Sequence, residues 1–573
     1  MSFFEDFAEE TSHFDDILAI PGVTLESLME ESEFLQEVRT GNPSLMSYLV
    51  EPETFELLLS YVLSSRNEDL SVEKRDKLPF VASEALGCHT MPLSDLLVQA
   101  DALDFLLDPF RSKAAILPPV AMYSISVLTS VMKKRPAEFY KWLVRESDIE
   151  ELSRLGSLLQ HVSSPHVVAF LKEMLKLEAD EAIVEDILDY LAEERLVDAL
   201  LKRMSPGRPL MDIMGSADVL LAVVQQVDTF ASSESVFSPL ETEISTVKLV
   251  DSVFSATSSN ALVANIHVLS ALVSHSLSNN MFGESGGKMP NSHLWAELER
   301  RTRDMMRILR KPPQTVVVDA SLTGIPGTKT IYKSISEGAV GTARLLVIEL
   351  VVQLVQADRA SLNKLLCKEV INQCLSMCFI YPWNNVLHSA ISSLVATALS
   401  REEDSILFKT VLTPAFVSQL VQAQQVKHAG WHGHLLQMGR SVSRSVNASA
   451  SIRGMVEEVD GWAFFVSWMS VQTERQSRLL GGDLPVRLSD NEPEFYDHSD
   501  QPVGDNHWGM ESAHFAAQAN GVNGLAEHAH AFDAYLSQAE AASDFDLMGD
   551  ADFSFFPTSP PSPPPESPSD GCE

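Results

Sequence analysis

The sequence has little of what β-sheet and disulfide-linked proteins depend on. Only 26 of its 573 residues are glycine, and Asn-Gly turns between alternating apolar runs are scarce, which favours helices over hairpins. Its five cysteines are an odd and sparse set for so long a chain. This argues against a disulfide framework and for a reducing compartment. We therefore expect a helical protein in the cytoplasm, with the nucleus as an alternative location.

An apolar leader and an uninterrupted membrane span are also missing. The start, Met1–Asp6, lacks the positive region and apolar core of a signal peptide. The apolar stretch Ala114–Met132 contains two consecutive prolines, and Leu345–Val355 is too short to span a bilayer and includes Glu349. We expect both stretches to be buried helices, and no insertion into a membrane.

Basic residues are in short supply, with 42 Lys and Arg against 79 Asp and Glu and a formal net charge of −37. A chain this acidic repels nucleic acid backbones and anionic membranes, so we expect neither as a partner. The excess is uneven, because the residues from Asp483 to the end include 18 acidic residues and one basic residue, Arg487. The sequence thus predicts a strongly acidic C-terminal tail.

Motifs of the common enzyme classes do not occur. Gly283–Lys288 resembles a phosphate-binding loop, but its first glycine stands one residue too close, and Met289 replaces the Ser or Thr that would hold magnesium. We find no Gly-x-Ser-x-Gly elbow, kinase signature or Rossmann fingerprint. Carboxylates are abundant, yet nothing selects a catalytic pair. We expect neither enzyme activity nor a cofactor.

Two clusters of potential metal ligands have a structural alternative. The three histidines within His428–His434 include a spacing of four residues that can bind zinc on a helix, but no His-Glu-x-x-His motif accompanies them. We favour a helix entry in which the ring nitrogens cap backbone groups. The three cysteines within Cys367–Cys378 recur on one helical face beside leucines, so we favour core packing over a metal or redox site.

Most of what is present is helical periodicity with short connections. Apolar residues recur at helical spacing, with about 40 residues for each helix pair, which is the period of HEAT and armadillo arrays. The expected helices are Leu45–Leu63, Leu93–Leu107, one opened by the capping box Ser147–Glu150, His166–Leu177, Glu181–Leu191, Arg195–Met204, Leu294–Leu309 and a series from Gly341 to about Thr473. The pattern predicts an all-α, irregular HEAT/armadillo-like solenoid, with a pair of globular helical domains as the alternative.

The domain organisation follows from changes in composition. We expect a partly ordered N-terminal segment at 1–20, a helical repeat domain at 21–480 with loops or insertions near 279–290 and 311–338, and a disordered tail at 481–573. The tail ends in a Pro- and Ser-rich stretch whose candidate phosphorylation sites are Ser559, Ser562 and Ser567.

Several stretches, taken together, resemble the SAPS-domain family of regulatory subunits of protein phosphatase 6. The resemblance spans roughly residues 20–470, about four fifths of the chain, and its order and spacing are more specific than any single motif. The stretches are Val23–Met29, Glu33–Glu37, Glu73–Glu84, Gly341–Leu345, Tyr381–His388 with its Trp-Asn-Asn-x-Leu-His element, and Gly430–Leu435.

The resemblance implies a regulatory subunit that binds the catalytic subunit of a type 2A-like, phosphatase 6-class serine/threonine phosphatase and helps to choose substrates. An ankyrin-repeat third subunit is also part of the family picture. The positions that we consider for partner binding are Arg344, Trp383, Asn384, Asn385, His388, Gly433 and His434.

Each of these positions has a structural alternative. Trp383 is expected to pack between helices while Asn384 or Asn385 caps the helix that starts near Val386. Arg344 contacts the partner or forms a structural ion pair. Phe80, within the N-terminal stretch, is expected in the core.

A stacked array also suits other binding proteins, because its long concave surface can hold a globular partner over a large area. The runner-up function is therefore a transport or trafficking adaptor of the karyopherin type. The partner recovered with the chain, a phosphatase catalytic subunit or a small GTPase with cargo, distinguishes the two.

Overall fold

A computed structural model describes residues 13–66, 71–88, 90–145, 152–227, 233–282, 292–314, 339–426 and 429–477. They fall within the first of two compact units, Met1–Val486. The predicted tail and its serines Ser559, Ser562 and Ser567 lie outside the described residues, as do the capping box Ser147–Glu150 and the loop at 315–338.

The described elements are all helices, and no strand occurs among them, which confirms the predicted all-α solenoid. The α-helices of the first half are α1 (His13–Leu18), α2 (Leu25–Glu30), α3 (Phe34–Thr40), α4 (Pro43–Leu49), α5 (Pro52–Val62), α6 (Val72–Gly87), α7 (Met91–Leu97), α8 (Ala100–Arg111), α9 (Pro118–Lys134), α10 (Pro136–Leu143), α11 (Arg154–Leu159), α12 (Pro165–Leu175), α13 (Glu181–Glu193), α14 (Leu196–Arg203), α15 (Leu210–Gln226), α16 (Ser233–Phe237), α17 (Glu243–Phe254) and α18 (Ser259–Phe282). Those of the second half are α19 (Ser292–Arg300), α20 (Thr302–Arg310), α22 (Thr342–Gln356), α23 (Ala360–Glu369), α24 (Ile371–Ile380), α25 (Asn385–Leu399), α26 (Ile406–Val411), α27 (Pro414–Gln425), α28 (His432–Ala448), α29 (Ala450–Glu457) and α30 (Trp462–Ser477). Two short 3₁₀ turns, η1 (Ser64–Arg66) and η2 (Ser238–Glu241), complete the set.

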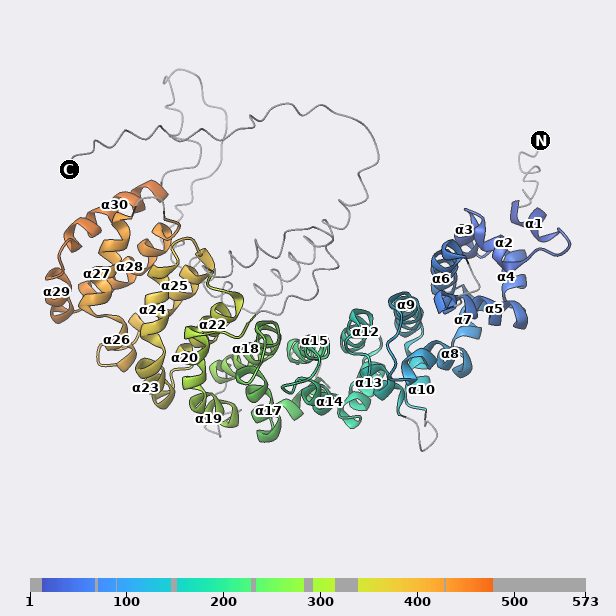
Figure 1. The fold of residues 1–573 in the computed structure, drawn as a ribbon, viewed down its shortest axis with the longest axis horizontal. Coiled ribbons are helices and arrows are strands. Elements are labelled where there is room, and N and C mark those ends of the chain that lie inside the picture. The colour runs from blue at the N-terminus through green and yellow to red at the C-terminus, as the bar shows by residue number, and fades with distance from the viewer. Residues whose placement is uncertain are drawn as a thin grey trace, which may run out of the picture. The chain divides into compact units, whose positions relative to one another are not determined.

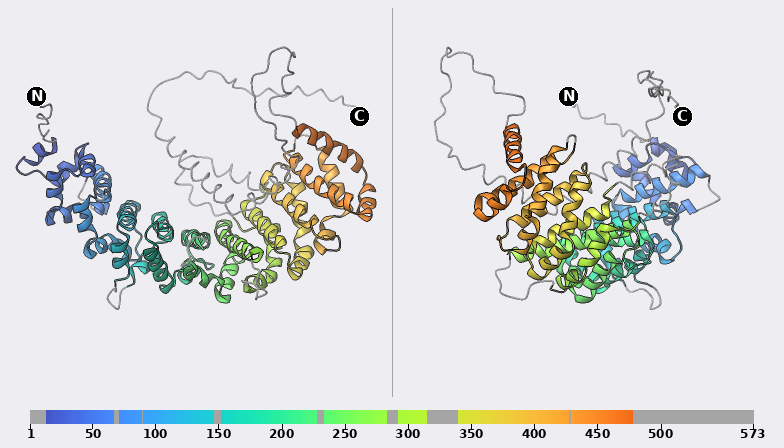
Figure 2. Two further views of the ribbon diagram at one scale, coloured as in Figure 1. Left: turned by 180° about the vertical axis from the view of Figure 1, so that it is seen from behind. Right: turned by 60° about the vertical axis from the view of Figure 1, so that its left-hand side comes forward.

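The helices stack in two rows that run along the chain (Figures 1 and 2). In the first row, α6, α9, α12, α15, α18, α22, α25 and α28 each contact the next. In the second row, the same holds for α10, α13, α14, α17, α19, α23 and α26. Within a row, each helix contacts the helix before it and the helix after it. Repeat proteins share this pattern, and their stability comes largely from such nearest-neighbour interfaces.

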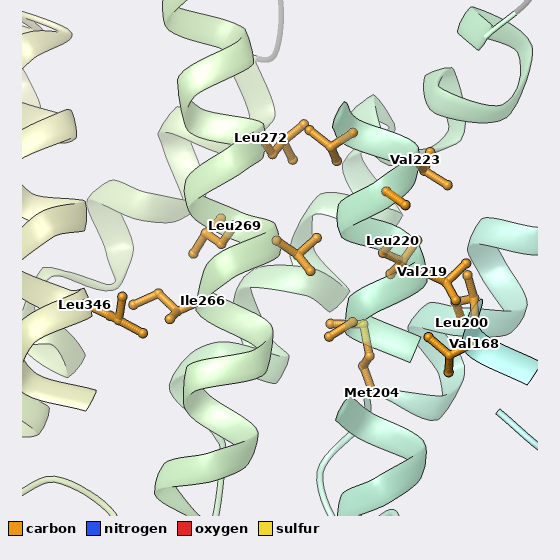
Figure 3. Close-up of a cluster of buried hydrophobic side chains, with 14 of the residues drawn as sticks. Val168, Leu200, Met204, Val219, Leu220, Val223, Ile266, Leu269, Leu272 and Leu346 are labelled. Carbon is orange, nitrogen blue, oxygen red and sulfur yellow. The ribbon is translucent and has the colours of Figure 1, made fainter. Parts of the chain in front are cut away.

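One continuous apolar core joins the rows, and Figure 3 shows its middle part. The labelled side chains come from α12, from α14 and its C-cap Met204, and from α15, α18 and α22. All are buried: Val168, Leu200, Met204, Val219, Leu220, Val223, Ile266, Leu269, Leu272 and Leu346. Burying one such side chain contributes roughly 1.5–3 kcal/mol. No helix of the array buries its apolar face alone, so each helix depends on its neighbours for its stability.

Three predicted single helices are in fact pairs. Leu45–Leu63 is split into α4 and α5 at Pro52, which takes the first position of α5, where a missing N–H does no harm. Leu93–Leu107 is split between α7 and α8, and Leu294–Leu309 is split at Arg301. The apolar period continues across each break, so periodicity alone did not reveal it.

Phe80 is a further correction, because its side chain is 47% exposed rather than in the core. The buried stripe of α6 runs through Leu78, Val81, Ala82, Ala85 and Leu86, at helical spacing. Phe80 follows Leu78 by two residues and therefore points away from that stripe. The cysteines Cys367, Cys374 and Cys378, by contrast, are buried as expected.

Among the described residues, α18 contains the one stretch, Ser259–Ser278, that is long and apolar enough to cross a membrane. Half of that stretch is buried, and α18 packs between α15 and α22 in the first row. The core helix of a soluble protein passes the same test of length and composition.

The approach of α15 to the start of α12 predicts that Gly215 tolerates no side chain. A Cβ at this position would lie 1.9 Å from the carbonyl oxygen of Val162 and 2.9 Å from Cγ2 of Val168. We expect Gly215→Ala to lower the free energy of unfolding by at least about 2 kcal/mol, because overpacking shifts the backbone. Chemical denaturation measures this.

The matched control is Gly454→Ala in α29, where a Cβ would meet nothing within 4 Å. Since alanine is the better helix former, this change should be neutral or slightly stabilising. Equal stability of both variants would contradict the close packing of α15 on α12.

Candidate functional site

Two of the sequence motifs, Tyr381–His388 and Gly430–Leu435, meet in the structure. We call this contact the Trp383 junction and define it as the turn Tyr381–Asn384 with the start of α25, and the segment Ala429–His434 that leads into α28. The backbone N–H of Gly430 donates to the carbonyl of Pro382 at 3.0 Å. A Cβ on Gly430 would lie 3.1 Å from Oδ1 of Asn385 and 3.4 Å from Cε3 of Trp383. Glycine therefore permits the close approach of the two segments.

Asn384 lies on the α25 side of the junction and is the N-cap residue of that helix. Its side-chain oxygen accepts a hydrogen bond from the backbone N–H of Leu387 at 2.9 Å, which is the geometry of a helix N-cap. This confirms the expected structural role of the Asn-Asn pair. Asn385 is the first residue of α25 and is exposed.

His388 lies beneath this turn and is fully buried. Its Nε2 is 3.2 Å from the carbonyl oxygen of Cys378, so Nε2 carries the proton and donates it. The ring also packs at 5.9 Å from that of Trp431 and at 5.7 Å from that of His434. His388 thus joins α24, α25 and α28.

Burial lowers the pKa of His388, and the neighbouring His434 adds to this effect against the opposing hydrogen bond to Cys378. Burial likewise lowers the pKa of His434. Nδ1 of each ring is buried without a hydrogen-bond partner among the described residues. Both rings are therefore held neutral, and a proton on either would be poorly stabilised.

Trp431 forms the other side of the support. Its Nε1 donates to the carbonyl of Ala423 at 3.1 Å, and its ring lies 6.3 Å from that of Phe379. Next to it, Nδ1 of His432 donates to the carbonyl of Ala429 at 2.8 Å. The bond from His432 to a backbone carbonyl matches the capping role that we favoured over a zinc site. Nδ1 of His434 has no hydrogen-bond partner among the described residues, and His428 lies outside them.

The buried cysteines next to this support have the character of core residues. Cys378 supplies the carbonyl that His388 contacts. Burial raises the pKa of Cys374 and of Cys378 to about 12, so both thiols stay protonated. A protonated buried thiol is neither a good nucleophile nor a good metal ligand.

Trp383 sits on top of this support and faces outward. Its side chain is 69% exposed, and the neighbouring Ile380 and Val386 are also exposed. The expectation that Trp383 packs between helices is therefore wrong, because Gly430 lets the indole rest against the α28 segment from outside. We call Ile380, Trp383 and Val386 the Trp383 patch. Exposed apolar groups on a rigid base are typical of protein docking surfaces.

Arg344 is linked to the junction, but not through the structural ion pair that was one of the two expectations. Its guanidinium donates to the carbonyls of Leu309 at 2.9 Å and Arg310 at 3.1 Å and to the hydroxyl of Tyr381 at 3.3 Å. Its hydrogen bonds thus go to backbone carbonyls and a hydroxyl, and no ion pair with a carboxylate is found among the described residues. Arg344 satisfies the last carbonyls of α20 and ties that helix to the Trp383 junction.

The candidate positions fall into two groups. Trp383, Asn385 and Gly433 are exposed and open to a partner, and a Cβ on Gly433 would meet nothing within 4 Å. Arg344, Asn384, His388 and His434 instead hold the junction together. Sequence reasoning missed Ile380 and Val386, since apolar residues next to helix ends are usually core, and it did not identify Trp431 as part of the support.

Comparison with known proteins agrees with these motifs. The SAPS family model, described as SIT4 phosphatase-associated protein, matches residues 129–365 and 363–475, which is more than half of the chain and includes the Trp383 junction.

Three relatives illustrate the similarity. Serine/threonine-protein phosphatase 6 regulatory subunit 3 of Gallus gallus is 22% identical over 82% of this chain and 58% of its own length. Subunit 1 of Homo sapiens is 22% identical with the same two coverages, and subunit 3-B of Xenopus laevis is 23% identical over 69% of this chain and 47% of its own length. The chain spans about half the length of these relatives.

The buried, neutral His388 predicts a pH-dependent stability. A folded-state pKa below the ordinary value of about 6.5 means that the unfolded chain takes up the proton first, so stability is lost as the pH falls below that value. We expect the free energy of unfolding to fall less for His388→Gln than for the native chain between about pH 7.5 and 5.5.

The matched control is His293→Gln, which removes a half-exposed histidine of α19. This variant should keep the native pH dependence. Identical losses in the native chain and in His388→Gln would contradict the account of His388.

Proposed function

Since the chain belongs to the SAPS family, we propose that it is a non-catalytic regulatory subunit of a serine/threonine protein phosphatase. It binds a type 2A-like catalytic subunit of the phosphatase 6 class and directs the choice of substrate. Support comes from the family match over 129–475 and from relatives that are named as phosphatase 6 regulatory subunits.

The observation that carries this proposal is the Trp383 patch on its rigid base. A tryptophan side chain has only two rotatable bonds, so it loses little freedom when a partner covers it and more of the contact energy remains as affinity. Tryptophan is among the residues that most often dominate protein interfaces. The rows of helices on either side extend the surface over which a globular catalytic subunit can be held.

The geometry needs no chemistry from the chain itself. Around the Trp383 patch, His388 and His432 donate to backbone carbonyls, and the cysteines are buried. What this arrangement can do is present a shaped surface. A subunit of this kind acts by placing the partner's active site relative to a substrate.

The runner-up, a karyopherin-like adaptor, predicts a small GTPase and cargo among the proteins that co-purify with the chain. The named relatives favour the phosphatase. We further propose a cytoplasmic or nuclear location and an ankyrin-repeat protein as third subunit of the complex, both of which affinity purification with mass spectrometry and imaging would test.

The tail serines Ser559, Ser562 and Ser567 are proposed as phosphorylation sites, because each is followed directly by proline in the acidic C-terminal part of the sequence. Phosphopeptide mapping of the chain from cells tests this. Unmodified serines under all conditions would rule it out.

We predict that Trp383→Ala weakens binding of the catalytic subunit at least tenfold, which corresponds to about 1.4 kcal/mol or more. The thermal unfolding midpoint should stay unchanged, because the side chain is mostly exposed. Titration of the full-length variant with the purified catalytic subunit measures the affinity.

Phe464→Ala is the matched control, since Phe464 on α30 is 63% exposed and lies outside the Trp383 patch. Native affinity is expected for this variant. If both variants bind as the native chain does, the patch is not the docking surface; if the native chain binds no phosphatase catalytic subunit at all, the proposed function itself is wrong.

A further inference from the structure

A basic stripe on α20 stands out in this acidic protein. Residues 300–311 contain five arginines and one lysine with a single acidic residue, Asp304, in a chain whose net charge is −37. Four of these arginines, Arg300 at the end of α19 and Arg303, Arg307 and Arg310 on α20, form what we call the basic stripe, and all four are exposed. The stripe is positively charged although the chain as a whole is negatively charged, so this surface calls for a functional explanation.

The stripe follows from helical spacing. Arg303, Arg307 and Arg310 recur at four and three residues, so they lie on one face, over about 10 Å of helix. The opposite face carries Thr302, Met305, Ile308 and Leu309, which are all buried against the array. Packing therefore fixes which way the arginines point, and the helix cannot turn them inward.

Part of the stripe is neutralised and part is not. Arg300 pairs with Glu297 at 2.7 Å, and Arg307 approaches Asp304 at 3.3 Å and donates to the carbonyl of Phe254 at 2.7 Å. Arg303 and Arg310 form no ion pair with a carboxylate among the described residues. These two arginines can therefore pair with a partner's carboxylates without first breaking an ion pair to another described residue.

The helix that carries the stripe is held in place from both ends. At its start, Arg301 pairs with Asp251 at 3.0 Å and with Glu297 at 3.0 Å. At its end, Arg344 binds the carbonyls of Leu309 and Arg310. A fixed row of charges gains more on binding than a mobile one, because less ordering is required.

We propose that the basic stripe of α20 is a second docking surface, separate from the Trp383 patch, for an Asp/Glu-rich segment of a partner protein. Carboxylates that alternate along an extended chain recur about every 6.6 Å, since each residue rises about 3.3 Å. Such a segment can follow arginines spread along a helix. One phosphate would instead need donors that converge on a point.

Long polyanions fit less well. Dissolved salt screens the interaction between exposed charges beyond about 8 Å at physiological ionic strength. A short acidic segment bound at the stripe therefore interacts mainly with the arginines of the stripe. A nucleic acid duplex or an anionic bilayer extends further and meets the acidic remainder of the chain. A short peptide-like ligand is therefore the occupant that charge complementarity selects.

The test uses the full-length chain and a fluorescein-labelled peptide of roughly ten glutamates as probe, at about 50 mM and about 150 mM salt. Binding by fluorescence anisotropy should weaken about tenfold at the lower salt in Arg303→Gln/Arg310→Gln. The charge-retaining variant Arg303→Lys/Arg310→Lys should bind within about threefold of the native chain.

The matched control is Arg208→Gln/Arg453→Gln, which removes the same charge from two exposed arginines elsewhere. It should bind within about twofold of the native chain. An equal loss in this control, absence of binding by the native chain, or tighter binding of a DNA duplex or of phosphatidylserine vesicles than of the peptide would each overturn the proposal. Equal unfolding midpoints of all variants show that folding is not the cause.

Discussion

The packing of each long helix against the next one of its row is the constraint on which the rest of the structure depends. Helices of this length are marginal alone, and their stability comes from an amphipathic face covered by neighbours. The row α6 to α28 covers those faces one by one, through side chains such as Leu220, Leu269 and Leu346. Everything that a partner could contact is carried at helix ends and outer faces that this packing leaves uncovered.

The Trp383 junction shows how the rows produce a surface feature. Stacking of α25 on α28 brings two short entry segments together, and Gly430 allows their backbones to touch. Buried rings of His388 and Trp431 then fill the space below. Trp383 remains outside this packing, with its indole against Gly430 and its side chain mostly exposed. The tight internal packing and the exposed aromatic side chain therefore both follow from the stacking of α25 on α28.

The helical array, the buried cysteines and the cap at Asn384 could be predicted from the sequence, because each depends on local spacing or on one residue type. The break at Pro52 has a sequence signal in the proline itself, whereas the outward direction of Phe80 and the exposure of Trp383 could not be predicted. They depend on which face the neighbouring helix covers, and apolar residues look alike before that is known. The hydrogen bonds of Arg344 could not be predicted either, because the backbone carbonyls at the end of α20 give no sequence signal.

The central claim is that a phosphatase catalytic subunit docks on the Trp383 patch. Hydrogen–deuterium exchange of the full-length chain, alone and saturated with the catalytic subunit, tests this most directly. Our account predicts slower exchange on binding in the segments 380–386 and 429–434. A tight complex in which the exchange of both segments is unchanged would contradict it.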